Sequence, residues 1–467
     1  ISALDYDRTG AQRLFARVMT WLIKLLLVIT LMGEIVFGIW AWLARDTPQG
    51  LLLAGLSAAL LPLLILVCAA AIASATLQAV GRFAASALAP AVLNLCWILG
   101  AAYLAPRFAN DPVTQAYLLA ICILVGGALQ WMIQGPSLRR EGFRWRVQNN
   151  YSYDDPKLRE QLRHIRRGML PTMLALTVTQ LNTLSDSLVA WLLAAPRDGS
   201  QTIHWLGDVA YPMQEGAVSA IYFGERLYQF PLGLIGIAVA TSVFPVLSKH
   251  ANRSDLHSLT DDLTLGLRLV LLLALPSAVG LVILAEPIAR LMFQHGRFTD
   301  ADTLRTARMI AIYGAGVWAY CSLPVLVRGF YAMNDRIGPL RIALAAVALN
   351  LLLDFTLIWP LAEAGLAFAT VATAAVQVAA LSMYFSHSHI SLQWRKLRAT
   401  IMRAMIASVA MALVGLITLR CIPPTASNWN AFWRLAIPLA ASSAVYLAII
   451  AAIGRADWRE LRSHRNE

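Results

Sequence analysis

Charged residues are scarce in this sequence. Asp, Glu, Lys and Arg make up 14% of the 467 residues, whereas an ordinary soluble domain has about 25%. Six stretches have no charged residue at all, and each approaches or exceeds the ~18–20 residues that a helix needs to cross a bilayer. They are 47–81, 83–106, 112–138, 227–248, 309–327 and 435–454. This scarcity excludes a soluble enzyme, a coiled coil and a disordered chain, and it predicts a polytopic membrane protein.

Catalytic and metal-binding motifs are also missing. The five cysteines form no CxxC pattern, and the eight histidines show no HExxH spacing. There is no Walker A loop for ATP and no G-x-S-x-G nucleophile elbow. We therefore expect transport or scaffolding and no enzymatic activity. A membrane glycosyltransferase stays open as an alternative, although its acidic residues would usually need a larger external loop than 196–215.

The apolar segments predict an all-α protein with about twelve transmembrane helices. The expected spans are 18–43, 51–80, 84–106, 113–135, 169–195, 216–247, 263–285, 304–327, 340–361, 364–386, 401–420 and 435–453.

The basic residues follow the loops between these spans. The formal net charge is +12, but the basic residues lie in short loops between apolar segments, which indicates membrane topology and not a nucleic-acid site. Loops and tails on the side of the termini hold 26 Lys and Arg, and the opposite loops hold seven. The positive-inside rule therefore predicts that both termini are cytoplasmic. The long basic loop 136–168 is expected to be a cytoplasmic linker with a helix lying on anionic lipids.

Several polar residues lie inside the predicted spans, where an ionisable group costs about 2.5–3.5 kcal/mol at the centre. Asp186 lies in 169–195, and Asn350 and Asp354 lie one helical turn apart on one face of 340–361. Together with the hydroxyl of Thr370, they form a set of hard oxygens suited to an alkali or alkaline-earth cation or to protons. The alternative is that both carboxylates bond to backbone or lie at the mouth of a cavity.

Three further charges lie in spans. Glu225 and Arg226 precede Pro231, which should kink the helix. The guanidinium of Arg226 could bind phosphate bidentately, or the two residues could face neighbouring loops. Arg268 could face a cavity or extend to the cytoplasmic headgroups.

Several sequence strings resemble one family in order along the chain. They are ATLQAVGRFAASALAPAVLNL (75–95), GGALQWMIQGPSLRREG (126–142), ERLYQFPLGLIGIAVATSVFPVLSKH (225–250), LRLVLLLALPSAVGL (267–281), FQHGRFTDAD (293–302) and RGFYAMNDRIGPLRIAL (328–344). This pattern resembles the MurJ (MviN) family of lipid II flippases, in the multidrug/oligosaccharidyl-lipid/polysaccharide (MOP) exporter superfamily.

The resemblance implies a two-lobed transporter with fourteen helices, of which this chain would lack the first two. We expect a fragment that lacks the family's arginine-rich first helix. The implied organisation is a truncated N-lobe of four helices (1–135), the cytoplasmic linker (136–168), a C-lobe of six helices (169–386), and a helix pair with a cytoplasmic tail (387–467).

The resemblance also implies roles for particular residues. Arg226 matches a cavity arginine of the family, beside Glu225 where Asp is common, so both become candidate substrate-binding residues together with Arg268. The sodium site of some family members maps onto Asp186, Asn350, Asp354, Thr370 and the backbone carbonyl of Leu366. No cofactor is expected apart from Na⁺ as a coupling ion, and the membrane potential is the alternative driving force.

The implied function is movement of lipid II from the cytoplasmic to the outer leaflet of the bacterial inner membrane by alternating access. The implied partners are lipid II, membrane lipids and cell-wall synthesis proteins, and no nucleic acid. Two alternatives stay open. One is an exporter of another lipid-linked oligosaccharide or of drugs, although a drug exporter should have an acidic or aromatic cavity in place of an arginine-lined one. The other is a non-transporting scaffold for cell-wall enzymes.

Overall fold

The computed structural model of the protein describes residues 8–108, 110–143, 180, 182–196, 202–203, 207–388, 390–423 and 428–453. The chain divides into two compact units, Ile1–Met169 and Leu170–Glu467. Nearly all of the described structure is helical, as the apolar segments predict. Helices suit a bilayer because each satisfies its backbone hydrogen bonds within its own segment.

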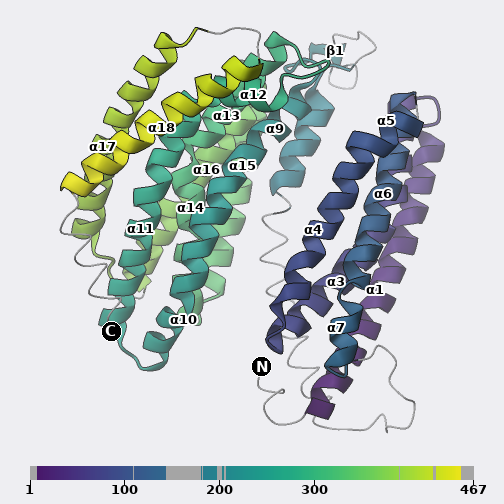
Figure 1. Cartoon of the computed structure of the whole chain (residues 1–467), viewed down its shortest axis with the longest axis horizontal. Helices are drawn as coiled ribbons and strands as arrows, with labels where there is room; N and C mark the ends of the chain where they lie inside the picture. Colours follow the sequence, from purple (N-terminus) through teal and green to yellow (C-terminus); the bar gives the residue numbers. More distant parts are fainter. Residues whose placement is uncertain are drawn as a thin grey trace. The chain divides into compact units, whose positions relative to one another are not determined.

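The first unit is a bundle of helices (Figure 1). The helix bounds are α1 (Arg8–Leu43), α2 (Pro48–Leu60), α3 (Pro62–Ala79), α4 (Phe83–Leu99), the π-helical turn η1 (Gly100–Leu104), α5 (Ala105–Phe108), α6 (Pro112–Met132) and α7 (Gly135–Arg140). Four segments are long and apolar enough to span a membrane: Gly10–Leu43, Pro48–Ala79, Phe83–Phe108 and Pro112–Arg140. They correspond to the first four predicted spans.

The second unit begins, in its described part, with residues 180 and 182–193 in helical conformation. A short antiparallel pair of strands follows, β1 (Thr202–Ile203) and β2 (Val209–Ala210). The remaining elements are α9 (Ala217–Pro231), the π-helical turn η3 (Leu232–Ile237), α10 (Ala238–Asn252), α11 (Leu256–Ile283), α12 (Ala285–Phe293), α13 (Asp300–Ala315), α14 (Val317–Ala332), α15 (Ile337–Leu361), α16 (Glu363–Ser388), α17 (Trp394–Cys421) and α18 (Asn428–Ile453).

The predicted count of twelve spans compares with ten membrane-length helices in the described residues, or eleven if a bent pair counts as one span. The bent pair is α13 and α14, which meet at Gly316 at an angle of 40°. The predicted span 169–195 is described only at 180 and 182–195, and most of the predicted linker 136–168 lies outside the described residues. The predicted fold class, a polytopic all-α membrane protein, is confirmed, and the short pair β1–β2 is a minor addition to it.

The core of the second unit lies where α10, α11, α14 and α16 meet. Leu263 and Leu267 of α11 pack there with Phe330 of α14 and Phe385 of α16, and all four are buried. In contrast, Phe230 on α9 is 73% exposed and Leu352 on α15 is 62% exposed. Large apolar side chains on the outside of a bundle indicate contact with lipid.

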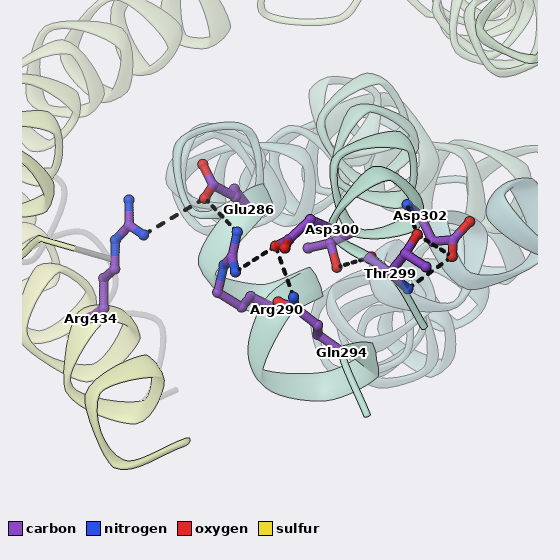
Figure 2. Close-up of polar contacts among 8 residues, drawn as sticks. Glu286, Arg290, Gln294, Thr299, Asp300, Asp302 and Arg434 are labelled. Carbon is purple, nitrogen blue, oxygen red and sulfur yellow. Dashed lines mark hydrogen bonds and ion pairs between the residues drawn. The ribbon is translucent and has the colours of Figure 1, made fainter. Parts of the chain in front are cut away.

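The last two helices pair with each other, and α17 also packs against α11 (Figure 1). A chain of polar contacts joins α18 to α12 and α13 (Figure 2). Arg434 of α18 lies 3.7 Å from the carboxylate of Glu286, which also pairs with Arg290 at 3.5 Å. Arg290 pairs in turn with Asp300 at 2.9 Å, and Gln294 donates a hydrogen bond to the same carboxylate oxygen. These contacts tie one end of the final helix to the rest of the unit.

Candidate functional site

A cavity of about 690 Å³ lies inside the second unit. Residues 182–186 and helices α9, α13, α14, α15 and α16 form its walls. Its volume falls within the 300–1,000 Å³ typical of small-molecule sites. Its polar lining consists of Asn182, Thr183, Asp186, Glu225, Tyr228, Tyr313, Tyr320, Arg328, Tyr331, Thr370, Thr373 and Gln377.

Close packing against α13 and α14 places α9 in the wall of the cavity. A Cβ atom at Gly224 would lie 2.5 Å from Cβ of Met309, so only glycine lets α9 approach α13 this closely. Pro231 ends α9, and the π-helical turn η3 follows it directly, as expected when proline removes a backbone donor. Gly236 in that turn lies against the backbone of Cys321 on α14. These contacts place the side chains of Glu225 and Tyr228 in the cavity wall.

The predicted cation ligands gather in the buried wall formed by 182–193, α15 and α16. Asp186 is buried, and one of its oxygens accepts a hydrogen bond of 3.1 Å from the hydroxyl of Thr370. The same hydroxyl bonds to the carbonyl of Leu366 at 3.0 Å. Asn350 and Asp354 are fully buried on α15, and the carboxylate of Asp354 is close enough to that of Asp186 to interact with it.

Several oxygens in this wall lack a hydrogen-bond partner among the described residues. They are one oxygen of Asp186, both carboxylate oxygens of Asp354 and the amide oxygen of Asn350. A buried polar atom without a partner is costly, and native proteins rarely keep one without a reason. The described residues contain no group of three or more His, Cys, Asp or Glu side chains that could hold a metal ion. The wall does bring two carboxylates close to neutral amide, hydroxyl and carbonyl oxygens, which are ligands of the kind that hard cations prefer.

Aromatic rings form the wall beside Glu225. The hydroxyl of Tyr228 donates a hydrogen bond of 3.3 Å to Glu225. The ring of Tyr228 stacks on Tyr320, with centroids 4.4 Å apart, and lies 5.6 Å from the ring of Tyr313. This end of the cavity is therefore both acidic and aromatic.

The two predicted substrate-binding arginines lie elsewhere. Arg226 is exposed on α9 and is absent from the described lining of the cavity, because adjacent helical residues point about 100° apart. Its guanidinium lies over the ring of Tyr222 at 4.6 Å and bonds to the hydroxyl of Tyr222 and to Gln229, each at 3.0 Å. Arg268 is buried and donates a hydrogen bond of 3.0 Å to Thr400 on α17.

The cavity inside the second unit has few basic residues in its lining. In the part of the chain that the structure describes, Arg328 is the one basic residue in its lining. The sequence analysis did not identify Tyr228, Tyr313 and Tyr320 as residues of the site. Tyr228 carried a usable signal, because it follows Glu225 by three residues and so shares its helix face. Tyr313 and Tyr320 come from two other helices, and no spacing along the chain could connect them with Glu225.

Comparisons with known proteins identify relatives of the whole chain. The family model described as "Lipid II flippase MurJ" matches residues 2–437. A probable lipid II flippase MurJ from Vibrio cholerae is 33% identical over 314 residues, which is 67% of this chain and 54% of the relative. The corresponding protein from Rhizobium tropici is 27% identical over 463 residues, or 97% of this chain and 82% of the relative. The chain thus spans about half the length of the Vibrio relative.

Solved structures share the fold. A lipid II flippase MurJ in an inward closed conformation aligns with a TM-score of 0.70 and 22% identity, over 96% of this chain and 84% of that one. An inward-facing multidrug transporter of the MATE family, also in the MOP superfamily, aligns with a TM-score of 0.62 and 12% identity, over 86% of both chains. At these identities the likeness establishes the MOP transporter fold.

Proposed function

Because this chain belongs to the MurJ family, we propose that it moves lipid II from the cytoplasmic to the outer leaflet of the bacterial inner membrane. The observation that carries the proposal is the family match over residues 2–437 of a chain with a transporter fold. The protein acts as a transporter and not as an enzyme. A non-transporting scaffold would have no need of a cavity that buries polar side chains within a membrane bundle.

Alternating access is the mechanism that this fold supports. The headgroup of lipid II enters from the cytoplasmic side, and the protein then rearranges to expose it outside, while the lipid tail stays in the membrane. Residues in the π-helical turn η3 after Pro231 offer a place where α9 and α10 can change their relative direction, since such turns interrupt the regular helical hydrogen bonds.

Arg226 is the candidate ligand for the diphosphate. Its side chain is exposed, and Tyr222 and Gln229 of the same helix hold its guanidinium in place. A guanidinium that is already oriented loses less freedom when it binds a phosphate bidentately. Arg268 is buried against Thr400, so we assign it a role in attaching α17 to α11 and not in contacting the substrate.

Na⁺ is the proposed coupling ion. Asp186, Asn350, Asp354, Thr370 and the carbonyl of Leu366 would hold it, and the unpartnered oxygens among them support this assignment. A bound cation would balance two carboxylates that otherwise lie close together in a buried wall. The orientation follows from the positive-inside rule, with both termini in the cytoplasm.

Depletion rescue tests the function. The gene product replaces the flippase of a bacterial host whose own flippase can be switched off, and growth and exposure of lipid II on the outer surface are followed. We expect the host to survive and to expose lipid II. An Arg226→Ala variant should lower exposure at least tenfold, because a charge-assisted contact to phosphate is lost. Lysis of the host despite normal insertion of the wild-type protein would refute the proposal.

A further inference from the structure

The acidic and aromatic end of the cavity has no role in binding a diphosphate. We propose that this end, formed by Glu225, Tyr228 and Tyr320, binds an ammonium group, namely the primary amine carried by the peptide of the lipid II headgroup. This inference rests on the proposed function and adds the part of the substrate that the cavity recognises.

The chemistry of the lining matches an ammonium group. Glu225 offers a carboxylate, and an ion pair with a hydrogen bond is about twice as strong as a neutral hydrogen bond. Tyr228 and Tyr320 both line the cavity beside Glu225, and an aromatic ring attracts a cation within about 6 Å of its centre.

Unpartnered groups in the same lining point to a ligand. The hydroxyl oxygens of Tyr320 and Thr373 have no hydrogen-bond partner among the residues described. These residues are 8% and 6% exposed, and both line the cavity. An ammonium group has three N–H donors, so it suits a site with several unused acceptors.

The opposite end of the cavity repels a cation, so only one end of the cavity is suited to an ammonium group. Arg328 lies eight residues after Tyr320 on α14, roughly 12 Å further along the helix at 1.5 Å per residue. Its guanidinium lies over the ring of Phe244 at 5.0 Å. An ammonium group is therefore drawn away from Arg328 and towards Glu225.

A comparison of two substrates tests the inference. The full gene product is reconstituted in vesicles, and the initial rate of flipping is measured for lipid II and for lipid II with its peptide amine acetylated. Acetylation removes the charge and should slow the wild-type protein about tenfold, the loss expected for a charge-assisted contact. In Glu225→Gln the two substrates should move at rates within about twofold of each other.

Controls separate the possible outcomes. Asp46→Asn changes a carboxylate whose side chain is 91% exposed, in the loop between α1 and α2, and it should keep the tenfold difference. Tyr320→Leu removes an aromatic face and serves as a second variant if Glu225→Gln does not fold. Equal rates for both substrates in the wild type, or the same slowing by acetylation in the wild type and in Glu225→Gln, overturn the inference and leave the flippase function standing.

A free organic cation is the alternative ligand that the same lining would attract. If the wild type exports ethidium in a Glu225-dependent way while acetylation leaves flipping unchanged, the site belongs to free cations and the inference is wrong. Failure to flip either form of lipid II overturns the proposed function and this inference with it.

Discussion

Replacing Asp354 should abolish the stabilisation of the protein by Na⁺. Both of its carboxylate oxygens are buried and have no hydrogen-bond partner in the described residues. Each unsatisfied buried group costs about 1–3 kcal/mol. A cation that contacts both oxygens removes this cost, so we expect it to bind with a free energy of about −4 kcal/mol. This corresponds to a Kd of about 1 mM. At 100 mM Na⁺, about a hundred times this Kd, linkage gives a gain of about 2.7 kcal/mol in the free energy of unfolding.

The assay is equilibrium unfolding of the purified protein in mixed micelles, in 100 mM NaCl and in 100 mM choline chloride. We expect the wild type to gain about 2.7 kcal/mol in NaCl, and Asp354→Asn to gain less than about 0.5 kcal/mol. Asp46→Asn, whose side chain is exposed, should respond as the wild type does. A full response to Na⁺ in Asp354→Asn, or no response in the wild type, would refute the reasoning.

Three further predictions concern packing and the ends of helices. Gly224→Ala should lower the free energy of unfolding by about 1–3 kcal/mol, because its Cβ would overlap Met309. Gly233→Ala should leave the free energy of unfolding unchanged, because no atom lies within 4 Å of the added carbon. Equal losses of unfolding free energy in the two variants, measured by denaturant titration, would contradict this prediction. Arg305→Met should cost about 3–5 kcal/mol in the same titrations, because it leaves the largely buried carboxylate of Glu363 unpaired. Arg45→Met, whose partner Asp46 is exposed, should cost less than about 1 kcal/mol. A similar loss in Arg305→Met and Arg45→Met would rule out a stabilising role for the buried Arg305–Glu363 pair. Thr299→Ala removes the capping box with Asp302 and should cost about 1 kcal/mol by thermal unfolding. An unchanged midpoint would show that the cap is dispensable.

The positions of most helices could be predicted from the sequence, because a helix in a bilayer needs about 20 apolar residues and charges interrupt such runs. The bend at Gly316 could not be predicted, since hydropathy does not change there and the segment reads as one span. A Cβ at Gly316 would lie 2.9 Å from the ring of Tyr320 and from Val371 on α16. The bend thus depends on contacts with another helix, and the sequence around Gly316 does not indicate those contacts.

The candidate site was predictable in part. Asn350 and Asp354 could be placed on one face from their spacing, and both are buried in the same wall as Asp186 and Thr370. The direction of Arg226 could not be derived, because either of two neighbouring charged residues on a helix can face a cavity. Glu225 faces the cavity and Arg226 does not line it. Tertiary packing of α9 against α13 decides between them, and that packing depends on Gly224.

The most direct test of the account is the movement of lipid II by the purified protein in a defined membrane. The full gene product is reconstituted in vesicles with fluorescent lipid II, and the fraction of lipid II accessible from outside is followed over time. We predict that lipid II crosses the membrane at a rate that rises with the amount of protein and falls at least tenfold in Arg226→Ala. A rate no higher than that of protein-free vesicles, with the protein folded and inserted, would contradict the account.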